Sequence, residues 1–283
     1  MRFAKMHGLG NDFIVIYGLS EVPERADELA VRMCDRHFGV GADGLVFILP
    51  SERADCRMRI FNADGSEAEQ CGNAIRCVAK YIYDNGLVDT VEPRIETAGA
   101  GVQQLSLKVT GGKVDAVRVN MGAPVLEPAK IPAKLDGERL VNVPIEAAGR
   151  QFRMTAVSMG NPHCVIFVDD AEAVDLAQWG PSLEHHPLFP NRTNVEFVTV
   201  RTRSELIMRV WERGAGPTLA CGTGACASLV AAVLNGTANR SADVRLPGGT
   251  LRIEWDERDG NVYMTGPVET VFFGEWPSNG RTS

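Results

Sequence analysis

This sequence lacks the segments that would assign it to a membrane or to a secretory route. Its longest apolar run, residues 225–234, is too short to span a bilayer. The first residues, MRFAKMHGLGNDF, contain no apolar core of signal-peptide length. Seven cysteines are present, an odd number, and their spacing does not form a disulfide framework. We therefore expect a protein of the reducing cytoplasm, without a membrane partner.

Basic residues and cofactor motifs are also scarce. Lys and Arg number 29 against 36 Asp and Glu, which gives a net charge of −7 and argues against a nucleic-acid partner. The chain has no Walker-type loop with its Lys and no Gly-x-Gly-x-x-Gly after a strand. The intervals between its cysteines do not match a zinc site. We expect no cofactor and no metal, and a charged small molecule remains a possible ligand.

What the sequence does contain is a repeat. Cys221 follows Cys71 by 150 residues (221 − 71), and other matches fall at the same offset. They hold in one register, without gaps, from about residue 10 to about residue 99. The matched segments include Gly10-Asn11 with Gly160-Asn161, MRIF at 58–61 with MRVW at 208–211, and Asn85-Gly86 with Asn235-Gly236. Such an ordered series predicts an internal duplication, with one cysteine at an equivalent place in each copy.

The duplication sets the expected domains. A Pro-, Ala- and Gly-rich stretch, residues 122–150, separates the copies and could hold two short strands. A final strand pattern over 268–273 exceeds the second copy's strand count, so it is expected to return to the first copy's sheet. We predict a first domain over residues 1–121, completed by 267–283, and a second over 122–266.

Each copy shows many short strand patterns and two helix patterns. The first helix pattern covers about 23–38 in one copy and 172–183 in the other, and the second directly follows the Cys-Gly pair of each copy. Strands and helices do not alternate as a doubly wound sheet requires, so the expected class is α+β. The helix after Cys71 is apolar on most sides, with Ile75, Val78 and Ile82. Because such a helix must be surrounded, we predict two pseudo-symmetric domains, each a mixed or antiparallel sheet wrapped around a central helix.

A cysteine at a helix N-terminus suits acid–base chemistry. Backbone N–H groups and the helix dipole favour the thiolate of Cys71 or Cys221 and can also bind a carboxylate, while Gly72 and Gly222 allow close approach. If the two copies face one cleft, one thiolate can remove a proton from a carbon beside a carboxylate while the other thiol delivers one from the opposite face. This arrangement predicts inversion at that carbon.

Polar residues in the loops beside these helices indicate what the ligand carries. An Arg holds a carboxylate in bidentate fashion, as Arg213 could, and Glu212 could pair with an ammonium. His163 could assist proton transfer or orient a thiol, although a structural role is equally compatible with the sequence. The further candidate ligands are Asn11, Asn62, Asn73, Asn161, Asn194 and Thr223.

Other interpretations of the cysteines stay open at this point. Free cysteine is often a small buried residue, and we keep that interpretation for the other five. A redox dithiol made by Cys71 and Cys221 is chemically possible, although no Cys-x-x-Cys motif supports it. A binding protein for amino acids without catalytic activity is a third possibility.

These motifs together resemble the diaminopimelate epimerase family. The matching segments run in order through nearly the whole chain and are specific as a set: GLGNDF at 8–13, RIFNADGS at 59–66, CGN at 71–73, GNPH at 160–163, RTNVEF at 192–197, WERG at 211–214 and CGTG at 221–224. The resemblance implies a cofactor-independent interconversion of LL- and meso-diaminopimelate in lysine and peptidoglycan precursor biosynthesis. It also implies a two-domain fold and a homodimer.

The resemblance assigns roles residue by residue. It makes Cys71 and Cys221 the two bases, with His163 and Glu212 supporting catalysis. The implied substrate-binding residues are Asn11, Asn62, Gly72, Asn73, Asn161, Asn194, Glu212, Arg213, Gly222 and Thr223. Some members carry Gln where this chain has Gly44, so that side-chain contact is not carried over. A related racemase acting on proline or hydroxyproline is the nearest alternative, and it would not need Glu212 and Arg213.

Overall fold

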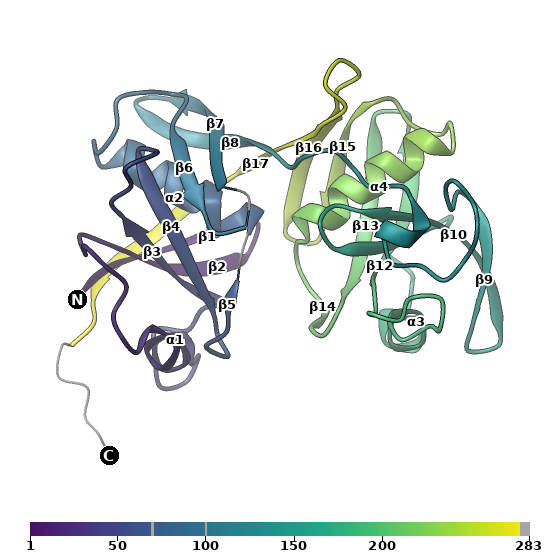
Figure 1. Cartoon of the computed structure of the whole chain (residues 1–283), viewed down its shortest axis with the longest axis horizontal. Helices are drawn as coiled ribbons and strands as arrows, with labels where there is room; N and C mark the ends of the chain where they lie inside the picture. Colours follow the sequence, from purple (N-terminus) through teal and green to yellow (C-terminus); the bar gives the residue numbers. More distant parts are fainter. Residues whose placement is uncertain (69–70, 100, 278–283) are drawn as a thin grey trace. The chain divides into compact units, whose positions relative to one another are not determined.

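The structure is a computed structural model that describes residues 1–68, 71–99 and 101–277. The chain divides into two compact units, one of residues 1–119 with 266–283 and the other of residues 120–265 (Figure 1). Each unit is a mixed sheet with few helices, so the predicted α+β class is confirmed.

The first unit contains a sheet, an outer helix α1 (Ala26–Cys34) and a central helix α2 (Gly72–Asp84). Its strands are β1 (Arg2–Gly8), β2 (Asn11–Tyr17), β3 (Gly44–Leu49), β4 (Cys56–Asn62), β5 (Glu67–Ala68), β6 (Arg94–Thr97), β7 (Gly101–Thr110), β8 (Lys113–Asn120) and β18 (Glu269–Glu275). Most neighbours are antiparallel, while β2–β3 and β4–β6 are parallel. Parallel neighbours need a crossover connection, and α1 and α2 lie in those two connections.

The second unit repeats this order with α3 (Leu176–Glu184) and α4 (Gly222–Leu234) as its helices, after a short 3-10 helix η1 (Pro128–Lys130). Its strands are β9 (Val143–Ala147), β10 (Arg150–Ser158), β11 (Pro162–Phe167), β12 (Asn194–Thr202), β13 (Glu205–Glu212), β14 (Gly216–Pro217), β15 (Ser241–Leu246), β16 (Gly249–Trp255) and β17 (Val262–Pro267). The parallel pairs are again equivalent, β11–β12 and β13–β15.

The last strand shows how the duplication is completed. β18 pairs antiparallel with β1, so the C-terminal segment does return to the first sheet. In the second unit the corresponding place beside β10 is taken by β9, which comes from the connecting segment 120–150. That segment contributes one strand, η1 and an isolated bridge from Val125 to Ser158, instead of the two short strands expected.

Alternate side chains of a strand face opposite sides of the sheet, one side toward an outer hydrophobic cluster and the other toward the central helix. On β12, Val195 and Phe197 belong to an outer hydrophobic cluster that also contains Leu176 and Leu183 of α3. Successive strand side chains point to opposite faces, so Asn194 and Glu196 face the other way, toward α4. α4 packs against β10, β11, β12, β13, β15 and β16, and α2 has equivalent neighbours in the first unit (Figure 1). The central helices are therefore enclosed as predicted.

Details of the helices differ from the sequence-based expectation. α1 begins at Ala26 and ends at Cys34, several residues before the expected end near 38, because the Asp35 carboxylate accepts from the N–H groups of His37 and Phe38 and forms a turn. α3 begins at Leu176 rather than 172, where Asp175 caps two N–H groups. α2 is not apolar on most sides, since it also buries Arg76 and Lys80.

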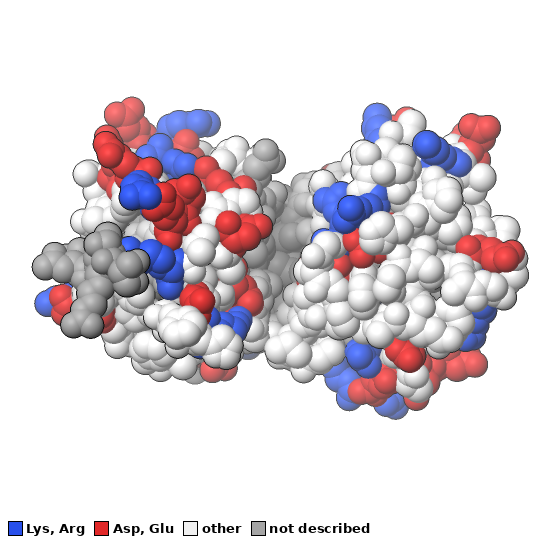
Figure 2. Space-filling model, turned by 90° about the horizontal axis from the view of Figure 1, so that it is seen from below, with Lys and Arg blue, Asp and Glu red and all other residues white. Residues whose placement is uncertain are grey.

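The surface has mixed charge. Figure 2 shows Lys and Arg side chains interspersed with Asp and Glu on the face displayed. Among the described residues, no helix has the length and apolar character needed to cross a membrane.

Candidate active site

Both Cys-Gly pairs begin the central helices. Cys71 and Cys221 are the N-cap residues of α2 and α4, with extended backbones (φ −149°, ψ 114° and φ −123°, ψ 107°). Their carbonyl oxygens accept the first helical hydrogen bonds, each over 3.0 Å, from the N–H groups four residues further on. The predicted helix starts are confirmed. The Cys71 side chain is half-buried, and that of Cys221 is only 6% exposed.

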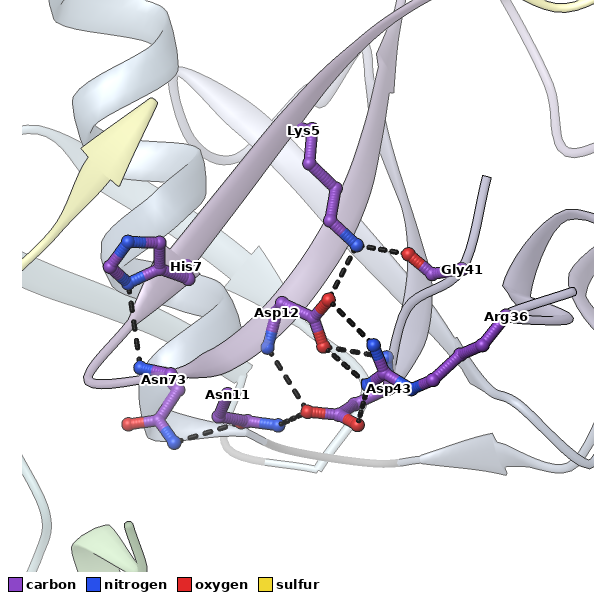
Figure 3. Close-up of polar contacts among 9 residues, drawn as sticks. Lys5, His7, Asn11, Asp12, Arg36, Gly41, Asp43 and Asn73 are labelled. Carbon is purple, nitrogen blue, oxygen red and sulfur yellow. Dashed lines mark hydrogen bonds and ion pairs between the residues drawn. The ribbon is translucent and has the colours of Figure 1, made fainter. Parts of the chain in front are cut away.

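The first unit brings Asn11 and Asn73 together (Figure 3). Nδ2 of Asn73 donates to Oδ1 of Asn11 over 2.8 Å. Oδ1 of Asn73 is buried and has no hydrogen-bond partner among the described residues. A buried acceptor without a donor is costly, so this oxygen is available to a ligand N–H. Asn62 instead donates to Oγ of Ser66 over 3.0 Å, which is the contact of a turn residue.

A two-residue turn aims Asn11 at the α2 N-terminus. Gly8 pairs with Asn11 across β1 and β2, so the connection is Leu9-Gly10, with positive φ at both residues (57° and 84°). That turn type matches the twist of a hairpin and favours Gly in its second position. At the equivalent place of the second unit Gly160 also has positive φ (92°) and precedes Asn161.

A charged cluster holds Asn11 from behind (Figure 3). Nδ2 of Asn11 donates to Oδ2 of Asp43 over 2.7 Å, and Nη2 of Arg36 contacts Oδ1 of Asp43 over 2.7 Å and Oδ1 of Asp12 over 2.8 Å. Lys5 completes the cluster with a contact to Asp12 over 2.5 Å. Burial alone would raise the pKa of Asp12, but the hydrogen bonds from Arg36 and Lys5 outweigh it and lower the pKa to about 2.

We expect this cluster to make folding stability acid-sensitive. A carboxyl group whose folded pKa lies below its unfolded value of 3.8 stabilises the fold above that value and loses its contribution as pH falls through the folded pKa. The Asp12 carboxylate is 16% exposed, and its contribution to the free energy of unfolding should fall by about 2 kcal/mol between pH 6 and pH 2. We expect the difference in free energy of unfolding between wild type and Asp12→Asn, measured by denaturant unfolding, to become smaller by this amount from pH 6 to pH 2. A difference that does not change with pH would contradict the assignment. Asp115→Asn, on the exposed surface, is the control.

In the second unit a chain of polar contacts ends at the thiol of Cys221. Nδ2 of Asn161 donates to Oγ1 of Thr223 over 3.3 Å, and Oγ1 of Thr223 lies 3.5 Å from Sγ of Cys221. Sγ also accepts from the N–H of Gly224 over 3.3 Å. Asn73 and Thr223 are equivalent in the repeat, and each is the second residue of its central helix. Asn73 contacts Asn11 in the first unit, and Thr223 contacts the equivalent Asn161 in the second.

His163 lies behind Asn161 in a fully buried position. Its Nε2 is 2.9 Å from Oδ1 of Asn161, and its Nδ1 is 2.7 Å from Oε1 of Glu196. Both His163 and Glu196 are 0% exposed. They come from the parallel neighbours β11 and β12, on the face that packs against α4.

The environment of Cys221 corrects one expectation. Although it caps a helix, the pKa of its thiol is raised well above the usual value because the side chain is buried beside the carboxylates of Glu212 and Glu196. Hydrogen bonds from Thr223 and the Gly224 N–H oppose the shift without reversing it. The shift is therefore opposite in direction to the lowering expected from the helix N-terminus.

Glu212 is the last residue of β13, and Arg213 follows it in the turn to β14. Burial raises the pKa of Glu212, and the hydroxyl of Thr218 donates to its Oε1. The backbone N–H of Arg213 donates to Oδ1 of Asn194 over 2.9 Å, and Nδ2 of Asn194 donates to the Pro162 carbonyl over 2.9 Å. Asn194 thus fixes backbone, while the exposed Arg213 side chain extends from the turn.

Two glycines of α4 lie close to neighbouring side chains. A Cβ at residue 222 would lie 2.9 Å from Sδ of Met264. A Cβ at residue 224 would lie 2.8 Å from Oε1 of Glu196 and 3.1 Å from Sγ of Cys221. Gly222 therefore has a structural reason independent of a ligand, and Gly224 lets a carboxylate approach the thiol.

The structure brings six of the predicted site residues into two groups, one in each unit. Asn11 and Asn73 form one group, and Asn161, His163, Cys221 and Thr223 form another. Sequence reasoning missed Asp43, Thr218 and Glu196. A signal existed for Glu196, because it is the one charged residue between Asn194 and Val200 in an otherwise apolar and Thr-containing strand.

The fold is that of a pseudo-symmetric two-domain class that includes amino-acid racemases. A probable proline racemase from Agrobacterium radiobacter superposes with a TM-score of 0.71 at 17% identity, covering 98% of this chain and 93% of the other. A phenazine biosynthesis protein of the PhzF family from Bacillus anthracis also gives 0.71, at 18% identity, with 98% and 99% covered. At such low identities the likeness defines the fold alone.

Sequence similarity defines the family. The chain belongs to the diaminopimelate epimerase family, whose model matches residues 3–127 and 155–271. It is 58% identical over 279 residues to the diaminopimelate epimerase of Pelotomaculum thermopropionicum, covering 98% of this chain and 99% of that protein. It is 56% identical over 275 residues to that of Acetivibrio thermocellus, with 97% and 98% covered. The resemblance seen in the motifs is confirmed.

Proposed function

We propose that this protein interconverts LL- and meso-diaminopimelate by inverting one α-carbon, in lysine and peptidoglycan precursor biosynthesis. The observation that carries the proposal is family membership over nearly the full chain, combined with a cysteine at the N-cap of each enclosed central helix. The reaction removes one proton from the α-carbon and delivers another to its opposite face, so it needs a base and an acid of similar strength, which two thiols provide.

Cys71 and Cys221 are the two bases in this proposal. One thiolate removes the α-proton, and the other thiol delivers a proton to the opposite face, so that the protein is ready for the reverse reaction after each turnover. Burial raises the pKa of the Cys221 thiol and favours its protonated form, so this thiol is the proton donor in the direction in which Cys71 acts as the base.

The helix N-termini stabilise the charge that develops during the reaction. In this proposal backbone N–H groups at the beginning of α2 and α4, next to Gly72 and Gly222, face the substrate carboxylate and the enolate-like oxygen that forms when the proton leaves. His163 and Glu212 support the Cys221 side, where Glu212 raises the thiol's pKa.

The distal end of the substrate requires a second set of ligands. The exposed guanidinium of Arg213 binds a carboxylate, and Glu212 binds an ammonium. Asn73 supports substrate binding through its Oδ1, which has no partner among the described residues. Asn11 orients Asn73, and Asn161 orients Thr223. The remaining proposed contacts come from Asn62, Asn194 and Thr223, of which Asn62 and Asn194 act through the turns that they hold.

We also propose a homodimer that acts in the cytoplasm. β18 exposes three consecutive apolar side chains, Val271, Phe272 and Phe273, at 56%, 46% and 63%. Apolar side chains on a surface strand favour contact with a second copy. Cys34, Cys56, Cys77, Cys164 and Cys221 are free thiols, which supports a reducing compartment. Phe273→Glu is expected to convert a dimer to a monomer in analytical ultracentrifugation, and an unchanged mass would contradict this interface.

A substrate panel tests the proposed function against its nearest alternative. We would incubate the reduced protein with LL-diaminopimelate, L-proline or trans-4-hydroxy-L-proline and separate the stereoisomers by chiral chromatography. We expect meso-diaminopimelate and no inversion of the cyclic amino acids. Inversion of proline would support the racemase alternative, and binding without inversion would support a binding protein. Reversible oxidation and reduction of Cys71 and Cys221, with no inversion of any substrate, would support the dithiol alternative.

A further inference from the structure

The two halves of the duplication differ at a buried pair of positions on two neighbouring strands. His163 and Glu196 correspond, at the offset of 150 residues, to Phe13 and Val46 in the first unit. All four side chains are almost completely buried, on equivalent strands. The first unit folds with an aromatic and an aliphatic residue here, so the fold does not require charges at this place. A buried ionisable pair costs desolvation, which points to a functional reason for keeping it.

The hydrogen-bond partners of this pair favour one charge state. Nδ1 of His163 faces a carboxylate oxygen of Glu196, and Nε2 faces the amide oxygen of Asn161. An ionised carboxylate and an amide oxygen are both acceptors, so both ring nitrogens must donate. An imidazolium would satisfy both contacts, with an ionised Glu196 as its counter-charge.

Glu196 also lies beside the reacting thiol. Its Oε1 and the Sγ of Cys221 are 2.8 Å and 3.1 Å from the point that a Cβ of residue 224 would occupy. Its second oxygen, Oε2, is buried without a hydrogen-bond partner among the described residues. The charged groups that face this position are His163 from β11 and Glu212 from β13, with Cys221 at the start of α4.

We propose that Glu196 is a positioning residue of the second half-site, an inference that rests on the proposed function. It fixes His163 as a cation, and the Nε2–H of His163 holds the Asn161 amide with its Nδ2 toward Thr223. Thr223 in turn contacts the Cys221 thiol. The chain Glu196–His163–Asn161–Thr223 therefore sets the donor geometry at Cys221 from inside the core, and the first unit has no equivalent of its charged part.

The test uses the full chain with three variants for comparison and a fourth, His163→Asn, for assignment of the signal. Glu196→Gln keeps the size but removes the charge, Glu196→Asp keeps the charge on a shorter side chain, and Thr155→Val removes a buried hydroxyl that bonds Asn142 and Asn235, the C-cap of α4. Histidine labelled with ¹⁵N reports the protonation of both ring nitrogens, and His163→Asn assigns the signal among five histidines. Circular dichroism and thermal unfolding check the fold of each variant.

We expect wild type and Glu196→Asp to show an imidazolium signal for His163, and Glu196→Gln to show a neutral ring. kcat/KM should fall about 10- to 100-fold in Glu196→Gln, the range for losing a hydrogen bond to a charged group, and less in Glu196→Asp. Thr155→Val should lower stability and leave both readouts unchanged. An unchanged His163 signal and rate in a folded Glu196→Gln would overturn the inference. An inactive wild type would instead remove the proposed function, and the ¹⁵N signal would still decide the charge of His163.

Discussion

Cys71→Ala and Cys221→Ala should each reduce the epimerisation rate by on the order of 10²- to 10⁴-fold, the range for removal of a general acid or base. Each variant leaves one face of the α-carbon without a proton donor or acceptor. Because the interconversion runs in both directions through both thiols, neither variant should be active in one direction only. Rates are measured from LL- and from meso-diaminopimelate under reducing conditions.

Two other cysteines provide matched controls for this prediction. Cys77 is fully buried in α2, and Cys56 is buried on β4, where burial raises the thiol pKa of each to about 12. Cys77→Ala and Cys56→Ala should lose some stability but keep a rate near that of wild type. If Cys71→Ala or Cys221→Ala kept wild-type rates in both directions, the two-base mechanism would be wrong.

Arg213→Lys should lower kcat/KM by on the order of 10²-fold, mainly through a higher KM. A guanidinium binds a carboxylate through two parallel hydrogen bonds, and an ammonium on a flexible chain does not reproduce them. The backbone of this turn is well held, since Asn194 accepts from the N–H of Arg213 and Glu184 accepts from that of Gly214. The substitution therefore keeps these two backbone hydrogen bonds, while it removes the bond that the guanidinium donates to the Asn191 carbonyl.

Steady-state kinetics with LL-diaminopimelate give the KM and kcat of Arg213→Lys separately. The control is Arg258→Lys, which changes an exposed Arg whose contacts are to Asp256 in the turn between β16 and β17. It should leave both constants unchanged. A lower kcat with an unchanged KM in Arg213→Lys would show that Arg213 acts on the chemical step and not on substrate binding.

Much of the fold could be predicted because the duplication is visible in the sequence. The repeat gave the equivalent helices after Cys71 and Cys221, and the surplus strand pattern near the C-terminus indicated the pairing of β18 with β1. The connecting segment was harder to predict, because one of its strands, β9, takes the place that β18 occupies in the first unit. Helix bounds also depended on local caps such as those of Asp35 and Asp175.

The candidate site was predictable where residues repeat and unpredictable where they do not. Asn11 and Asn161 recur at one offset, so both were found. Glu196 has no repeat partner of its kind, and only tertiary packing shows that its carboxylate lies beside Cys221. For the same reason the direction of the pKa shift of Cys221 differs from the expected one, because the helix N-terminus is local in sequence while the burial of the thiol and the carboxylates of Glu212 and Glu196 are not.

The most direct test of the two-base mechanism is the incorporation of solvent deuterium. The reduced protein is incubated in heavy water with LL-diaminopimelate and no added cofactor, while proton NMR follows the α-hydrogen and the stereochemistry. The mechanism predicts that the inverted product carries deuterium at the α-carbon from its first appearance, because the entering proton comes from the second thiol. Inverted product that retains the original hydrogen, or no inversion at all, would contradict it.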